Sequence, residues 1–257
     1  MKQLFFALLL LFTSCAKNDK SLKIAATAVP HMEMLEQIKP DLEKQEINLE
    51  IIVVDDYNIP NRALADGEVD ANFFQHAPYL ASQVKMFNYP ITSIAKIHIE
   101  PMGVYSKKIK NIQDLKEKAI ISLPNDPTNE ARALGLLHHN GIIKLDNPDN
   151  LHATVLNIVE NPKEITFVEM DASMLPRTLQ DVDASIIPTN FALQADLKPT
   201  IDALLLEDST SNFANVIAIR IGDENRPELL ALKKAMTSPK MHKYILDKYK
   251  GAIVPLF

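Results

Sequence analysis

Short apolar runs alternate with amphipathic stretches from Leu22 onward, and this order limits the folds that the chain can adopt. The runs that we expect to be strands are 22–26, 49–54, 70–74, two between 91 and 106, 119–123, 165–169, 184–187 and 214–220. The stretches of helical character are 34–42, 61–68, 77–87, 112–118, 129–140, 175–181 and 227–249, the last broken at Ser238-Pro239. Strands and helices in this order predict open α/β sheets with right-handed crossovers.

The spacing of apolar residues adds detail to this prediction. The apolar residues of 34–42 fall on one helical face, and Gly141 closes the helix expected over 129–140. The run 49–54 (LEIIVV) is almost entirely apolar, as in a strand buried on both faces of a parallel sheet. Two α/β cycles of similar size, with a late strand and a terminal helix left over, predict two lobes joined by crossing segments. A ligand then belongs in the cleft outside the carboxyl ends of the strands.

The N-terminus has the pattern of an export signal. Lys2 precedes an apolar run of nine residues, 4–12, which is too short to span a bilayer because a span needs roughly 20 residues. Thr13, Ser14 and Cys15 follow it and resemble a lipoprotein signal, although Phe12 stands where such signals usually carry Leu. We expect residues 1–14 to be the signal peptide and 15–21 to be the lipidated Cys15 with a polar tether. The alternative is ordinary secretion with an unmodified Cys15.

Composition excludes several classes of function. The net charge is -6, and no basic cluster exceeds the short run 107–110, so we expect no nucleic-acid partner. Cys15 is the only cysteine, which leaves the mature chain without a disulfide, a thiol nucleophile or a thiolate metal site. The P-loop and the common hydrolase motifs are absent, and the adjacent His138 and His139 face different sides of a helix. We therefore expect no catalytic residues, no metal and no cofactor, and the chain is not predicted to be an enzyme.

One candidate binding segment is 123–132 (LPNDPTNEAR). A strand ends at Pro124, and a helix capped by Asp126 or Thr128 follows. Arg132 is expected in the first turn, where a positive charge opposes the helix dipole, and a guanidinium there can bind a carboxylate through two hydrogen bonds. The alternative is a surface arginine paired with Glu130. The segment alone does not decide between the two.

A second candidate segment is 70–80 (DANFFQHAPYL). On a strand, Phe73 and Phe74 point to opposite faces, so one can enter the core and the other the cleft. His76 and Tyr79 are three residues apart at a helix entrance and share a face. Aromatic rings around a cleft suit an apolar side chain or a thioether. Such rings more often pack in a core, and the residues alone favour that interpretation.

Several stretches together resemble a known family. They are VDDYNIPNRALADGEVDANFFQHAPYL, PMGVYSKK, LPNDPTNEARAL, GIIKL, ENPKEI and LPRTLQDVD, spread over residues 24–220. They are similar to the NlpA/MetQ lipoproteins, the methionine-binding subunits of methionine ABC importers. The resemblance implies a type II periplasmic-binding-protein fold, with two α/β lobes joined by a two-strand hinge. It places lobe 1 at 22–105 plus 213–257 and lobe 2 at 106–212.

The resemblance also implies a ligand site and partners. Arg132 is expected to bind the carboxylate of an amino acid. The full set of implied ligand-binding residues is Tyr57, Phe74, His76, Tyr79, Asn129, Arg132, Asn190 and Asn215. The implied partners are methionine or an analogue, an ABC permease with its cytoplasmic ATPase, and a membrane reached through the lipid anchor. The implied location is the cell membrane, on its periplasmic or exterior side.

Three positions depart from the family pattern. Pro188 stands where the family usually has an Asn that contacts the ligand, so one polar contact is lost unless Asn190 replaces it. Glu130-Ala131 stands where a Gly commonly precedes the arginine, and 27–31 reads TAVPH in place of TPGPH. The ligand therefore stays open between methionine, a methionine derivative, a methionine-containing peptide and another apolar amino acid. A surface lipoprotein that acts as an interaction partner is the alternative from another class.

Overall fold

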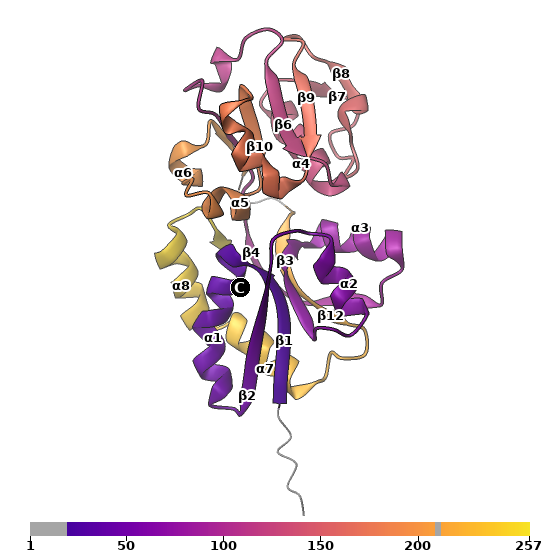
Figure 1. Ribbon diagram of the computed structural model, residues 1–257, viewed down its shortest axis with the longest axis vertical. Coiled ribbons are helices and arrows are strands. Elements are labelled where there is room, and N and C mark those ends of the chain that lie inside the picture. The colour runs from indigo at the N-terminus through magenta and orange to yellow at the C-terminus, as the bar shows by residue number, and fades with distance from the viewer. Residues whose placement is uncertain (1–19, 209–211) are drawn as a thin grey trace, which may run out of the picture.

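The computed structural model describes residues 20–208 and 212–257, which form two α/β lobes (Figure 1). The first lobe contains a six-stranded sheet in the order β13-β4-β12-β3-β1-β2. Its strands are β1 (Lys20–Thr27), β2 (Ile47–Val54), β3 (Ala71–His76), β4 (Ile91–Ile99), β12 (Ala214–Arg220) and β13 (Val254–Pro255). β1 is parallel to β2 and β3, whereas β12 is antiparallel to β3 and β4. The sheet is therefore mixed.

Helices cover both faces of this sheet (Figure 1). One face packs against α1 (Glu33–Glu43), α7 (Pro227–Met236) and α8 (Pro239–Tyr249), and the other against α2 (Ile59–Ala65) and α3 (Ala77–Phe87). A short segment, η1 (Ala28–Met32), follows β1, and its backbone is extended at Val29. The face of α1 predicted from its spacing is buried, at Met34, Leu35, Ile38 and Leu42. The predicted break at Ser238-Pro239 is also confirmed, because the Ser238 side chain accepts a hydrogen bond from the Met241 N–H and caps α8.

The second lobe is built on a five-stranded sheet in the order β11-β5-β10-β6-β9. Its strands are β5 (Gly103–Tyr105), β6 (Ile120–Pro124), β9 (Thr166–Met170), β10 (Ala184–Ile187) and β11 (Leu205–Leu206), and β7 (Lys144–Leu145) pairs with β8 (Ile158–Glu160) beside it. The helices are α4 (Pro127–His139), α5 (Thr189–Gln194) and α6 (Pro199–Asp202), with 3-10 segments η2 (Ile112–Asp114), η3 (Val155–Asn157) and η4 (Ala172–Gln180).

The chain crosses between the lobes twice, from β4 to β5 and from β11 to β12. The two crossings are hydrogen bonded to each other. The Glu207 N–H donates to the Met102 carbonyl over 2.9 Å, and the Met102 N–H donates to Oε2 of Glu207 over 3.1 Å. The predicted two-lobed α/β architecture is confirmed. β5 pairs within the second sheet, so the first crossing precedes the boundary expected at residue 105, and β1 already begins within the expected tether 15–21.

Three predicted elements differ from the structure. The run 49–54 is not buried on both faces, because β2 is an edge strand that pairs only with β1, and its Ile52 and Val53 are exposed. An apolar run alone does not reveal how many neighbours a strand has. The helices expected over 112–118 and 175–181 are instead the 3-10 segments η2 and η4. Pro176 lies inside η4, where it removes a backbone donor that an α-helix needs.

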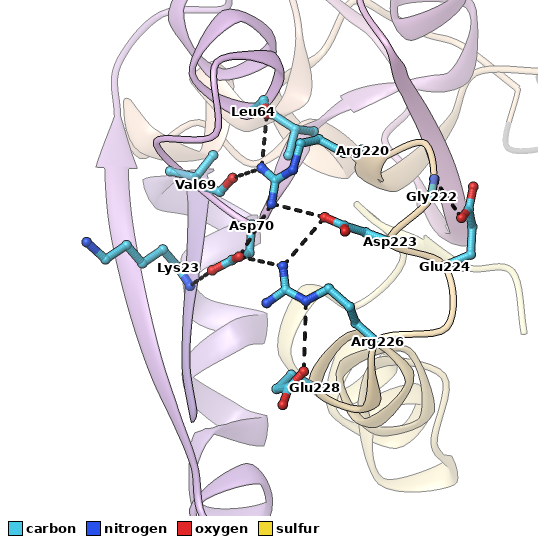
Figure 2. Close-up of polar contacts among 10 residues, drawn as sticks. All are labelled: Lys23, Leu64, Val69, Asp70, Arg220, Gly222, Asp223, Glu224, Arg226 and Glu228. Atoms are coloured by element: carbon cyan, nitrogen blue, oxygen red, sulfur yellow. Dashed lines mark hydrogen bonds and ion pairs between the residues drawn. The ribbon is translucent and has the colours of Figure 1, made fainter. Parts of the chain in front are cut away.

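A cluster of charged residues joins the start of β3 to the segment after β12 (Figure 2). Nη1 of Arg226 lies 2.7 Å from Oδ1 of Asp70, and Nη2 of Arg220 lies 3.0 Å from Oδ2 of Asp223. The Lys23 N–H donates to Oδ2 of Asp70 over 2.9 Å. β3 begins at this cluster and ends at His76, so the cluster and His76 lie at opposite ends of the strand.

Candidate functional site

A cavity lies where the two lobes meet. It is lined by all eight residues that the resemblance implied: Tyr57, Phe74, His76, Tyr79, Asn129, Arg132, Asn190 and Asn215. Pro188 also lines it, as do three residues that sequence reasoning missed, Gln75, Glu100 and Thr189. The lining comes from both lobes and from the first crossing. The structure therefore gathers the predicted set in one place.

The aromatic side of the cavity comes from β3, α3 and the segment before α2. Alternation along β3 places Phe73 in the core and Phe74 on the cavity, as predicted. The ring centroids of Tyr57, Phe74 and Tyr79 lie 5.9–6.0 Å from one another. Phe74 and Tyr79 are buried as core residues are, and they also line the cavity. The preference for core from the residues alone is therefore incomplete. These rings form an apolar wall.

His76 is held in one tautomer by the hydrogen-bond partners of its two ring nitrogens. Its Nδ1 accepts the backbone N–H of Tyr79 over 3.1 Å and caps α3, so the ring proton belongs to Nε2. Nε2 lies 3.0 Å from Oδ1 of Asn129 in the opposite lobe. Burial, and then the positive charge of Arg132, lower the pKa of His76 to about 3. His76 is therefore a neutral donor at neutral pH, and its hydrogen bond to Asn129 joins the two lobes.

Asn190 carries a buried donor that has no partner. Its Oδ1 accepts the Tyr57 hydroxyl over 2.6 Å, whereas its Nδ2 has no hydrogen bond to any described residue. An unsatisfied buried polar group costs about 1–3 kcal/mol. Asn190 lies in the first turn of α5, and Pro188, the residue that departs from the family pattern, is the N-cap of this helix. The free Nδ2 is therefore available to an acceptor in the cavity beside Pro188.

Arg132 is buried on α4 and makes contacts that the sequence did not indicate. Asp126 is the N-cap of α4, so Arg132 lies in the second turn and not in the first. The predicted alternative pairing with Glu130 is wrong, because the Glu130 carboxylate accepts the Val155 N–H over 3.1 Å. Nε of Arg132 instead donates to the Glu207 carboxylate over 3.0 Å.

The remaining contacts of Arg132 determine which N–H groups it can offer. Nη2 donates to Glu207 as well and to the Glu100 carbonyl over 2.7 Å, and the Phe213 ring lies 4.4 Å from the guanidinium carbon. A guanidinium has five N–H donors. These contacts use the one on Nε and the two on Nη2, which leaves the two on Nη1 without a hydrogen bond to any described residue. Arg132 is thus oriented by its own chain and keeps one nitrogen for a ligand.

Glu100 lines the cavity and lies between two buried histidines, an arrangement that sequence reasoning also missed. Nε2 of His98 lies 2.7 Å, and Nε2 of His31 lies 3.3 Å, from Oε1 of Glu100. Nε2 of His31 also lies 3.2 Å from Oδ1 of Asn215, and its Nδ1 lies 2.6 Å from the Thr27 hydroxyl. Burial lowers the pKa of His31 to about 4 and that of His98 to about 3. Both rings are therefore neutral at neutral pH.

Imidazole nitrogens and a carboxylate are also metal ligands, and these three lie within 4.8 Å of one another. The hydrogen-bond pattern accounts for the group in another way. Because Oδ1 of Asn215 is an acceptor, Nε2 of His31 must carry its proton, and a protonated nitrogen cannot bind a metal. The 2.7 Å separation between His98 and Glu100 is likewise a hydrogen-bond distance. We therefore assign the group as a carboxylate held by two neutral histidines.

Comparison with known proteins gives consistent results over nearly the whole chain. Residues 22–257 match the model of the family described as NlpA lipoprotein. The methionine-binding lipoprotein MetQ of Bacillus subtilis is 37% identical and aligns over 100% of this chain and 99% of its own length.

Two solved structures have the same fold. A nutrient-binding protein from Burkholderia cenocepacia bound to methionine is 46% identical, with a TM-score of 0.89 over 92% of this chain and 100% of that one. A periplasmic substrate-binding protein of an ABC transporter from Coxiella burnetii is 43% identical, with a TM-score of 0.87 over 91% and 100%.

Proposed function

Because this chain belongs to the NlpA lipoprotein family, we propose that it is an extracytoplasmic, lipid-anchored protein that captures methionine and delivers it to an ABC importer. The observation that carries the proposal is the pairing, in one buried cavity, of a guanidinium with a wall of aromatic rings. An amino acid with an apolar side chain is complementary to this pairing, because its carboxylate can bind the guanidinium while its side chain contacts the rings.

The carboxylate of the ligand binds Nη1 of Arg132 and Nδ2 of Asn190. Support comes from the state of these donors. Nδ2 of Asn190 is buried without a partner among the described residues, and the hydrogen bonds of Arg132 to described residues use Nε and Nη2. Asn190 in this role replaces the side-chain donor that Pro188 lacks. Asn129, Asn215 and His76 are further polar residues of the lining.

The thioether side chain lies against Tyr57, Phe74 and Tyr79. Sulfur–aromatic contacts contribute about 0.3–1.5 kcal/mol each, and burial of the methylene groups adds to this. A hydrophobic pocket separates ligands that differ by one methylene by only about 1–3 kcal/mol. Leucine and norleucine should therefore bind more weakly than methionine but measurably, whereas aspartate and lysine should not bind.

Attachment and delivery use parts of the chain beyond the cavity. Cys15, the residue proposed to be acylated, lies outside the described residues. Within residues 20–208 and 212–257, no helix has the length and apolar character needed to cross a bilayer. Acyl chains on Cys15 would hold the protein at the outer side of the cell membrane, since each buried methylene contributes about 0.8 kcal/mol. There the protein, with its two lobes closed around the ligand (the closed form), docks on a membrane permease that has a cytoplasmic ATPase. No catalytic step is assigned to this chain.

The proposal is tested by identifying what the protein carries. Mass spectrometry of ligand released from natively purified protein should detect methionine. Protein stripped of ligand by unfolding and refolding should then be stabilised by added methionine, by about 2.7 kcal/mol at 100 times the Kd. If a different molecule co-purifies and methionine gives no stabilisation, methionine is not the ligand.

A further inference from the structure

Glu100 brings a carboxylate to the same cavity as the Arg132 guanidinium. The side chain is almost fully buried and lies in the first crossing between the lobes, directly after β4. Its backbone carbonyl accepts a 2.7 Å hydrogen bond from Nη2 of Arg132. The residue that presents the negative charge is therefore in direct contact with the residue that presents the positive charge. An α-amino acid has the matching arrangement, with its ammonium and carboxylate groups both attached to the α-carbon.

The hydrogen bonds to Glu100 fix its side chain and still leave an acceptor position. His98 and His31 both approach one oxygen, Oε1. A carboxylate accepts about four hydrogen bonds. His31 also shares its single Nε2 proton with Asn215. The carboxylate thus has capacity for one more donor, and the cavity is the side from which that donor can come.

The charges around the cavity leave Glu100 without a matched cation. His31, His76 and His98 are neutral, and the positive charge of Arg132 is paired with Glu207. Burial raises the pKa of Glu100, which is the expected response of a carboxylate that has lost water, and the Arg132 charge opposes this effect. An unpaired buried charge is costly, so a ligand that supplies a cation at this position gains affinity.

We infer that the Glu100 carboxylate binds the ammonium group of the ligand, so that the cavity selects zwitterionic α-amino acids over carboxylic acids that lack the amino group. This inference rests on the proposed function and names a recognition group for it. His31 and His98 are positioning residues that orient the carboxylate through their contacts with Oε1. Arg132 then binds the carboxylate of the amino acid, Glu100 binds its ammonium group, and the aromatic wall contacts its side chain.

The test compares two ligands that differ only in the amino group, methionine and 4-(methylthio)butanoic acid, by calorimetry on ligand-free protein. The unaltered protein should bind methionine at least about thirtyfold more tightly, the ratio expected for one buried charge pair. Glu100→Gln keeps the shape and removes the charge. It should lose most of this preference by weakening methionine binding, with little change for 4-(methylthio)butanoic acid. Glu50→Gln, a matched change on the exposed edge strand β2, should bind both ligands like the unaltered protein.

Each contrary outcome has a distinct meaning. If the unaltered protein binds both ligands within about threefold, or if Glu100→Gln weakens both ligands equally, Glu100 does not bind the ammonium group and the proposed function still stands. If the unaltered protein binds neither ligand, the proposed function fails together with this inference. The ratio measured on the unaltered protein tests the inference even if Glu100→Gln does not fold.

Discussion

The hydroxyl of Tyr57 donates a 2.6 Å hydrogen bond to Oδ1 of Asn190, and this bond joins the two lobes across the cavity although 133 residues separate the partners. The contact between His76 and Asn129, at 3.0 Å, also joins the lobes. Both bonds connect residues that line the cavity, so they lie beside a ligand bound there. The residues proposed to bind the ligand thus also hold the lobes together around it.

Tyr57→Phe should therefore act mainly on ligand release. The ring remains, but the hydroxyl that bridges the lobes is lost. One hydrogen bond contributes about 0.5–1.5 kcal/mol, so methionine should dissociate about two- to tenfold faster, with a smaller change in its association rate. Stopped-flow kinetics measures both rates. Tyr89→Phe, which removes a hydroxyl from a tyrosine stacked on Phe87 away from the cavity, is the control and should leave both rates unchanged. An unchanged dissociation rate in Tyr57→Phe would show that this bond does not hold the closed form.

Arg132→Ala should abolish methionine binding, since loss of one partner from a buried charge pair costs about 2–5 kcal/mol. The free energy of unfolding should fall as well, because the Glu207 carboxylate then remains buried without its cation. Calorimetry reports the affinity, and urea unfolding shows separately that the variant is folded. Arg177→Ala removes an arginine at an exposed position and serves as the control. Folded Arg132→Ala with undiminished affinity would refute the assignment.

Asp70 gives a pH prediction that is independent of the ligand. Burial opposes its ionisation, but the Lys23 N–H and Arg226 together hold the pKa of Asp70 below its usual value of 3.8. A depressed folded-state pKa means that the stabilisation is present above the unfolded-state value and is lost as the pH falls through the folded-state value. Urea unfolding from pH 7 down to pH 2 should show this loss in the unaltered protein and a smaller one in Asp70→Asn.

The size of this effect is modest because the charged cluster is partly exposed. Asp70→Asn should lower the free energy of unfolding at pH 7 by about 1–2 kcal/mol. Methionine affinity should not change, because Asp70 and His76 lie at opposite ends of β3. Equal pH slopes in both proteins would show that Asp70 does not contribute to the pH dependence.

Cys15→Ser tests the anchor. Acylation needs the thiol, so the variant should incorporate no labelled fatty acid and should keep its signal peptide, whereas the unaltered protein should incorporate the label. Ser14→Ala keeps a small residue before the cysteine and should still be labelled. Absence of label on the unaltered protein would favour ordinary secretion with Cys15 unmodified.

Local patterns in the sequence predicted much of the fold. The strand Ala184–Ile187, the helix Ala77–Phe87 and the break between α7 and α8 were predicted at their observed bounds, because each depends on neighbouring residues alone. The burial of β2 was predicted wrongly, because exposure of a strand depends on its partners in the sheet. Helix type in η2 and η4 was also wrong. η2 has three residues, too few from which to read a period, and Pro176 inside η4 removes a backbone donor.

The same distinction between local and distant information applies to the cavity. Alternation along β3 predicted that Phe73 and Phe74 would separate, and the family resemblance indicated Arg132. Glu207, Glu100 and His31 were missed, because each acquires its role from a partner on a distant segment. The motif TAVPH offered one signal, since it places Thr27 four residues before His31, and the two side chains are hydrogen bonded. Nothing local indicated that His31 faces Glu100.

Asn190 and Pro188 give the last prediction, which concerns how this chain departs from its family. If Nδ2 of Asn190 replaces the donor that Pro188 lacks, Asn190→Ala should weaken methionine binding by about 1–3 kcal/mol. The loss of the Tyr57 partner contributes to this change, so Tyr57→Phe is the reference from which the contribution of Nδ2 is separated. Pro188→Asn should tighten binding in the otherwise unaltered protein.

Pro188→Asn should also recover part of the lost affinity when it is combined with Asn190→Ala, because an asparagine at the N-cap of α5 returns an amide donor to the same wall of the cavity. Asparagine is a favoured N-cap residue, so this change should not destabilise the helix. Calorimetry on the four proteins forms a double-mutant cycle that isolates the coupling between the two positions. If Pro188→Asn binds methionine no better in either background, while oxidised methionine or a methionine-containing peptide binds the unaltered protein tightly, the cavity is adapted to that other ligand.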